Sequence, residues 1–243
     1  MKNMRVLVLF SAVAFAFATT AAWAVIDYPV PPNHPSWWKI PSDPADGVTR
    51  TQFHSFITDP NPADTPPDYT YNGFSVAGVA DSWTFSFTPP FNTPIPGGVG
   101  PNYGDDGFGI YFPLNQSMEK WMWNLPNPKA VKQFFVCVSW WDWLPNASIA
   151  INCYSEDTQV SQTLTKVDGP IANGGQWHTT YLEGIIIPQP GHEYFQFTCD
   201  IGELPYIDSI WVGTHCVPEP STIAMMAFGA LGVAGGVIRK IRR

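Results

Sequence analysis

Tryptophan and aspartate side chains cluster at residues 140–143, where the sequence reads Trp-Trp-Asp-Trp. An exposed indole can cover the C–H face of a pyranose while a neighbouring carboxylate accepts hydrogen bonds from its hydroxyls. Strand alternation would send Trp140 and Trp141 to opposite faces of a sheet. Because tryptophan is highly buried on average, the same residues also suit a hydrophobic core. Trp140, Trp141, Asp142 and Trp143 are therefore a candidate polysaccharide-binding site, with core packing as the alternative.

No local motif supports catalysis. The five histidines fall in no His-Glu-x-x-His spacing, and no serine lies in a Gly-x-Ser-x-Gly motif. Adjacent carboxylates such as Glu156 and Asp157 are typical of solvated turns, since glycosidase carboxylates are defined by their separation in space. We therefore predict no catalytic residues and no cofactor. A secreted hydrolase is the alternative, and it would need a cleft that gathers groups distant in sequence.

A loop at Asn102–Gly107 combines oxygen ligands with glycines, which is the mixture that a hard cation such as calcium requires. Asp105 and Asp106 would be its ligands. The loop lacks the EF-hand spacing, and aspartate and glycine are also ordinary turn formers. We predict a turn here, with calcium binding by Asp105 and Asp106 as the weaker alternative and no other metal site.

Four cysteines, Cys137, Cys153, Cys199 and Cys216, occur after residue 130. An even number of cysteines in an exported chain suggests disulfides, whereas a zinc site would need a close Cys-x-x-Cys pair that is missing here. Four cysteines allow three sets of pairings. A hairpin of residues 133–140 and 147–154 would place Cys137 opposite Cys153, at a cross-strand distance close to that of a disulfide. Cys199 would then pair with Cys216.

Alternating aromatic and polar residues predict strands that position these side chains. Trp83, Phe85 and Phe87 alternate with Thr84 and Ser86, and Gly, Pro and Asn turns separate the later strand candidates. These candidates are residues 107–112, 132–140, 147–154, 159–166, 177–182, 184–187, 193–199 and 207–212. The helix candidate is a turn or two near 118–123. Many short strands without alternating helices favour an all-β antiparallel sandwich, specifically a jelly roll.

Fifteen of the 25 prolines lie between Val25 and Pro101. Such density excludes helices and central strands, yet aromatic residues interrupt the prolines, unlike in most disordered segments. We predict that residues 25–80 form an extended arm packed on a sandwich domain of residues 81–216. Trp37 and Trp38 in this arm are weaker candidates for the same sugar-binding role.

The first 24 residues are predicted to be a cleavable signal peptide. Lys2 and Arg5 precede an apolar stretch, and Ala22-Trp23-Ala24 offers small residues at the two positions that a signal peptidase reads. The alternative is an uncleaved signal anchor, but the apolar stretch is short for a membrane span.

The last 27 residues contain Val-Pro-Glu-Pro-Ser-Thr, an uncharged stretch from Ser221 to Ile238, and the basic end Arg-Lys-Ile-Arg-Arg. The stretch would be about 27 Å long as a helix, close to the ~30 Å hydrocarbon core of a bilayer. The basic end would remain cytoplasmic. Residues 217–243 resemble the PEP-CTERM sorting signal, which implies recognition of Pro218, Glu219 and Pro220 by an exosortase-like membrane protease.

Residues 25–217 contain six basic and nineteen acidic side chains, a formal charge of −13, although the whole chain has −8. This charge excludes nucleic acid as a partner, because phosphates need a basic face. Together the patterns predict an exported protein that is anchored in the inner membrane before processing. Its expected final location is the cell surface or extracellular matrix, with polysaccharide binding as the alternative molecular role.

Overall fold

The computed structural model describes residues 29–46, 48–55, 69–72, 82–98, 107–123, 130–156, 158–187, 192–201 and 205–218. These residues are all-β, with two antiparallel sheets and no helix. Accordingly, none of them belongs to a helix that could cross a bilayer. The predicted signal peptide and most of the sorting signal lie outside the described residues.

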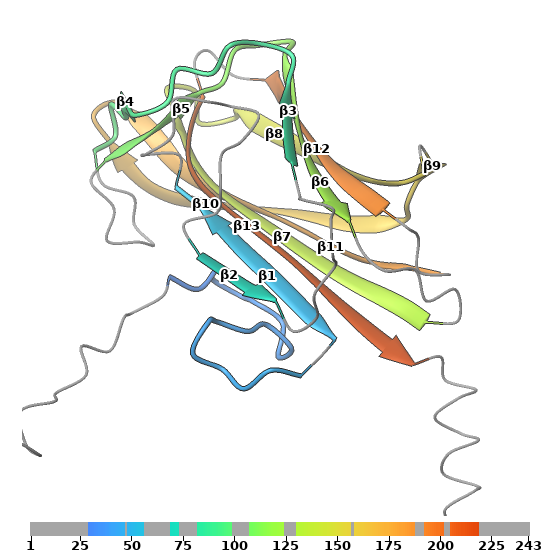
Figure 1. Cartoon of the computed structure of the whole chain (residues 1–243). Coiled ribbons are helices and arrows are strands. Elements are labelled where there is room, and N and C mark those ends of the chain that lie inside the picture. Colours follow the sequence, from blue (N-terminus) through green and yellow to red (C-terminus); the bar gives the residue numbers. More distant parts are fainter. Residues whose placement is uncertain are drawn as a thin grey trace, which may run out of the picture.

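The larger sheet, sheet A, has eight strands, and the smaller one, sheet B, has five (Figure 1). Sheet A consists of β1 (Thr49–His54), β2 (Tyr69–Asn72), β4 (Thr93–Pro94), β5 (Phe108–Tyr111), β7 (Ala130–Asp142), β10 (Gln162–Ala172), β11 (Gly175–Ile186) and β13 (Tyr206–Pro218). Sheet B consists of β3 (Ser82–Phe85), β6 (Ser117–Trp123), β8 (Ser148–Ser155), β9 (Thr158–Gln159) and β12 (His192–Ile201).

The main core lies between the two sheets. Sheet A has the order β10-β11-β7-β13-β1-β2, with β5 pairing the start of β13, and sheet B has the order β3-β6-β12-β8-β9. Alternate residues of β7, such as Phe134 and Val136, share a buried cluster with Phe195 and Phe197 of β12. This confirms the predicted all-β antiparallel architecture, and the packing is sandwich-like. The jelly-roll connectivity remains a prediction.

The predicted hairpin of residues 133–140 and 147–154 is wrong. β7 pairs with β11 and β13 in sheet A, whereas β8 pairs with β12 and β9 in sheet B. The chain therefore passes from one sheet to the other between Asp142 and Ser148. Hydrophobic side chains on both faces of β7 explain its position, because Phe134 contributes to the core between the sheets and Phe135 to a cluster on the other face of sheet A.

The predicted helical turn at residues 118–123 is also wrong, since this segment is strand β6. Met118, Lys120 and Met122 are buried, while Glu119 and Trp121 between them are only partly buried. The period is two, as in any strand with one face on a core. Lys120, a charged residue on the inner face, concealed the alternation in the sequence.

Neither predicted disulfide is present, because none of the four cysteines is bridged. Cys137 lies in the cluster on the outer face of sheet A, whereas Cys153 lies in the core between the sheets, so the backbone of sheet A separates them. Cys216 lies opposite Lys132 in the strand register, and the Lys132 side chain contacts Glu193 of β12. Cys199 lies six residues beyond Glu193 on β12, which is about 20 Å at the rise of a strand. That separation greatly exceeds the reach of a disulfide.

Burial raises the pKa of the Cys137 and Cys153 thiols, and Glu193 raises that of Cys153 further. Both groups are consequently held as neutral thiols inside hydrophobic clusters.

Strand β1 lies in the proline-rich region for which only extended loops were predicted. All six of its residues are buried, although most are polar. One face of β1 packs toward the core between the sheets, and His54 on this face contacts the Trp83 ring of β3 edge-on at 5.1 Å. The other face, with Phe53, joins the outer cluster of sheet A.

Because His54 is buried, we expect the folded domain to lose stability in mild acid. Burial, with a smaller effect of Lys120, lowers its pKa well below 6.5. The unfolded chain therefore binds a proton that the folded chain excludes, and the free energy of unfolding falls as pH drops below about 6.5, by up to about 1.4 kcal/mol per pH unit. Urea unfolding between about pH 7.5 and 5 measures this slope.

His54→Gln should reduce that slope, whatever it does to stability at neutral pH. His34→Gln is the matched control, because the His34 side chain is exposed. An unchanged slope in His54→Gln would show that His54 does not carry this proton uptake.

Candidate functional site

A segment before β1, residues 29–46, lies across the outer face of sheet A, and we call it the covering segment. Trp211 on β13 donates a hydrogen bond from Nε1 to the carbonyl of Pro29 at 3.2 Å. Thr51 on β1 donates from its hydroxyl to the carbonyl of Lys39. Trp38 packs edge-on against Phe135 of β7, with ring centroids 5.8 Å apart. These contacts attach a segment with no regular secondary structure to three strands of the sheet.

Gly213 on β13 makes this close approach possible. A Cβ atom at this position would lie 2.5 Å from Cζ3 of Trp38, a distance that side-chain packing does not allow. Any larger residue would have to displace the Trp38 ring. Glycine at this position therefore lets the covering segment lie directly on the sheet.

Trp37, next to Trp38, stacks on His215 of β13, with ring centroids 5.5 Å apart and ring planes within 11°. His215 Nδ1 lies 2.8 Å from the Thr49 hydroxyl, which donates its own hydrogen to Asp46. The hydroxyl must then accept from His215, so Nδ1 carries a proton. Burial lowers the pKa of His215, and Asp46 partly opposes this effect. The indole of Trp37 therefore stacks on a histidine ring that a hydrogen bond to Thr49 holds in place.

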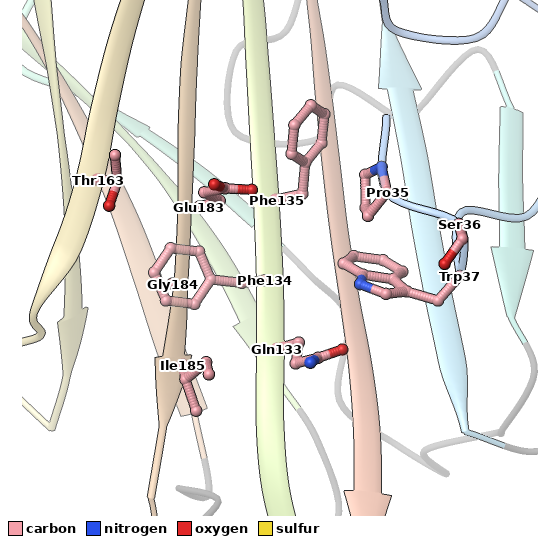
Figure 2. Close-up of a pocket in the computed structure, with 10 residues that line it drawn as sticks. All are labelled: Pro35, Ser36, Trp37, Gln133, Phe134, Phe135, Thr163, Glu183, Gly184 and Ile185. Atoms are coloured by element: carbon pink, nitrogen blue, oxygen red, sulfur yellow. The ribbon is translucent and has the colours of Figure 1, made fainter. Parts of the chain in front are cut away.

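Beside this stack, a groove of about 480 Å³ runs between the covering segment and strands β7, β10 and β11. Figure 2 shows its lining, with the Trp37 indole reaching from the covering segment toward β7. The strands contribute Gln133, Phe134, Phe135, Thr163, Glu183, Gly184 and Ile185, and the covering segment contributes Pro35, Ser36 and Trp37. The volume is within the range of small-ligand sites.

Strand register places the polar groups of the groove together. Glu183 of β11 lies opposite both Phe135 of β7 and Thr163 of β10, and Ile185 lies opposite Gln133. Glu183 is exposed and makes no ion pair with any other described residue. Its carboxylate is consequently available to accept hydrogen bonds from a ligand, beside an amide and a hydroxyl that can both donate and accept.

The groove does not include the tryptophan cluster predicted from the sequence. Trp140 and Asp142 are 0% exposed on the inner face of β7, and Trp141 is 0% exposed on the outer face. Trp143, which is 36% exposed, is the accessible member. Gln133 and Trp140 are seven residues apart on β7, about 23 Å at strand rise, so the groove and the cluster lie toward opposite ends of the strand.

Specific contacts explain why Trp140, Trp141 and Asp142 are buried. Trp140 donates from Nε1 to the Thr180 hydroxyl at 3.0 Å, and Trp141 donates to the carbonyl of Ala172 at 3.2 Å. Asp142 accepts a hydrogen bond from the backbone N–H of Leu144 at 2.6 Å, so its carboxylate holds the turn that leaves β7. A pyranose cannot reach these three side chains in the folded domain.

The calcium candidates Asp105 and Asp106 lie outside the described residues. Among the residues that the structure does describe, no group of three or more His, Cys, Asp or Glu side chains could hold a metal ion. Of the sorting residues, Pro218 ends strand β13, while Glu219 and Pro220 lie beyond the described part of the chain.

Sequence reasoning included Trp37 as a weaker candidate but missed its partners Gln133, Thr163 and Glu183. Alternation along β7 and β11 could have assigned each residue to a face of its own strand. It could not show that β11 lies between β7 and β10, and only that pairing brings the three polar side chains together.

Comparison with known proteins identifies the C-terminal segment. Residues 217–243 match the family model of the PEP-CTERM protein-sorting motif, which confirms the resemblance seen in the sequence. No curated protein matches the chain, and no solved structure matches it. The motif implies export, membrane anchoring and exosortase processing, followed by surface localisation. The exported domain is assigned to no family.

Proposed function

We propose that this protein, carrying a sorting motif that directs it to the cell surface, is a non-enzymatic matrix component whose domain binds polysaccharide in the groove beside Trp37. The observation that carries the proposal is that the indole of Trp37, stacked on His215, and the carboxylate of Glu183 line the same groove. A pyranose offers an apolar C–H face and a rim of hydroxyls. The groove supplies the complementary groups, an aromatic ring and hydrogen-bonding side chains.

Binding is favoured over hydrolysis by the composition of the groove. Its described lining contains one carboxylate, that of Glu183. Most glycoside hydrolases need two carboxyl groups that flank the scissile bond, about 5 to 10 Å apart. A surface protein that retains polysaccharide needs only affinity, which a ring and a few polar groups supply.

Trp37→Ala should weaken glycan binding about 30-fold, the equivalent of about 2 kcal/mol for a buried aromatic anchor. Isothermal titration against the best ligand from a glycan array measures the change. Trp37→Phe should retain most of the affinity, because it keeps a ring on His215. Trp143→Ala is the matched control, since Trp143 is partly exposed outside the groove.

Circular dichroism of each variant separates lost binding from lost folding. Equal affinity in Trp37→Ala and the wild-type protein would exclude the groove as the binding site. Release of reducing ends from the bound glycan that disappears in Glu183→Gln would contradict the non-enzymatic assignment.

A further inference from the structure

Strand β13 continues without a linker into the sorting motif. Val217 pairs with Val131 of β7, and Pro218, the first residue of Pro-Glu-Pro, pairs with Ala130. β13 lies between β7 and β1 inside sheet A (Figure 1). The segment that the processing enzyme must recognise therefore begins while the chain is still part of the folded sheet.

Very little chain separates this strand end from the membrane-spanning stretch. Glu219 and Pro220 alone stand between Pro218 and the uncharged stretch that starts at Ser221. A fully extended chain covers at most about 3.6 Å per residue, so the three steps from Pro218 to Ser221 reach about 11 Å. In the anchored chain, the end of β13 is held within that distance of the start of the span.

Exposed isoleucines lie at the same end of sheet A. Ile186 of β11, Lys132 of β7 and Cys216 of β13 occupy one row across the sheet. Ile187 lies one residue beyond this row and is 67% exposed, while Ile185, one residue before the row and 50% exposed, lines the groove. Ile187 therefore presents an exposed aliphatic side chain at the end of the sheet from which the sorting motif leaves.

We propose that the tether holds this end of sheet A on the outer surface of the bilayer in the anchored protein, with Ile187 in contact with lipid. The short connection limits the distance between the domain and the membrane, and Ile187 lies at the end of the sheet that the connection holds at the bilayer surface. Exosortase cleavage releases the constraint. The proposal rests on the membrane anchoring implied by the sorting motif and is independent of glycan binding.

Photocrosslinking of the full-length chain tests the contact. The chain is reconstituted in vesicles of phosphatidylethanolamine and phosphatidylglycerol, with p-benzoylphenylalanine in place of Ile187 or, as the matched control, Ile171. Ile171 is even more exposed, at 77%, but it lies opposite Gln176, ten residues before Ile186 on β11. Ten residues of strand span about 33 Å, so Ile171 lies about that far from the proposed lipid contact. The yield of lipid adduct at position 187 should be at least about tenfold higher than at 171.

A second variant tests the tether itself. A Gly/Ser spacer of about twelve residues between Val217 and Pro218 keeps the sorting motif and adds roughly 20 Å of root-mean-square reach. The lipid adduct at position 187 should then fall several-fold toward the level at 171. Equal yields at 187 and 171 in the native chain would overturn the proposal. So would crosslinking to protein in place of lipid, or a yield at 187 that the spacer does not change.

Discussion

Trp141→Ala is expected to lower the free energy of unfolding by about 3–5 kcal/mol, the cost of removing a large aromatic side chain from a packed interior. Trp141 is 0% exposed and clusters with Ile95 and Trp177. Its ring fills the space over Gly97 and Gly175, where a Cβ atom at either position would lie 2.3 Å from the indole. Truncation leaves a cavity and also removes the donor to Ala172.

Urea unfolding followed by tryptophan fluorescence and near-ultraviolet circular dichroism measures this loss. Trp143→Ala is the natural control, because the Trp143 ring packs edge-on against Trp141 at 4.4 Å but is partly exposed. Its cost should be below about 1.5 kcal/mol, the worth of an aromatic pair. Glycan affinity, measured where the domain remains folded, should stay within about twofold of wild type in both variants. A large loss of affinity in a folded Trp141→Ala domain would restore the tryptophan cluster as the binding site.

Lys132→Met should destabilise the domain by about 3–5 kcal/mol, because it removes the Lys132 cation that pairs with a buried carboxylate. Lys132 of β7 forms an ion pair with Glu193 of β12, and both side chains are 0% exposed. The pair joins the two sheets inside the core, next to the Cys153 thiol, whose pKa both charges influence. Removing the Lys132 charge takes away the attraction between Lys132 and Glu193, which offsets part of the desolvation cost of the Glu193 carboxylate.

The double variant Lys132→Met/Glu193→Leu should recover most of that loss or exceed wild-type stability, since well-packed apolar residues often replace a buried pair without cost. Lys166→Met is the comparison at a partly exposed pair, where Lys166 contacts the largely exposed Asp168 at 3.2 Å and also donates to the carbonyl of Ala147 at 2.7 Å. Such pairs contribute less than about 1 kcal/mol. A double variant as unstable as Lys132→Met alone would show that the pair is not energetically coupled.

Most strands could be predicted from the sequence because their alternation is a local property. The strand expected at residues 193–199 is contained in β12, and the one expected at 207–212 in β13. In two of the strands that were missed, buried polar residues interrupt the pattern. β6 carries Lys120 on its inner face, and β1 buries Arg50, Gln52 and His54. The alternation of apolar and polar residues therefore reveals a half-buried strand reliably only when the buried face of that strand is apolar.

Strand partners could not be predicted in the same way. The hairpin proposed for residues 133–140 and 147–154 satisfied local turn chemistry, yet β7 and β8 belong to different sheets. The disulfide expected between Cys137 and Cys153 depended on that pairing and failed with it. An error in strand pairing changes every contact that depends on that pairing, even when the bounds of each strand are predicted correctly.

By itself the sequence determined the destination of this protein and its fold class. The sorting motif is read as a linear segment, and strand alternation is a property of neighbouring residues, so neither depends on long-range contacts. Only the tertiary structure decided which tryptophans are accessible. Trp140 and Trp141 are buried because β7 is covered on both faces, by sheet B on one side and by segments distant in sequence on the other. Trp37 lines a groove because the covering segment crosses the sheet and forms one side of that groove. The exposure of a side chain depends on the segments that pack against it, and the sequence alone does not identify those segments.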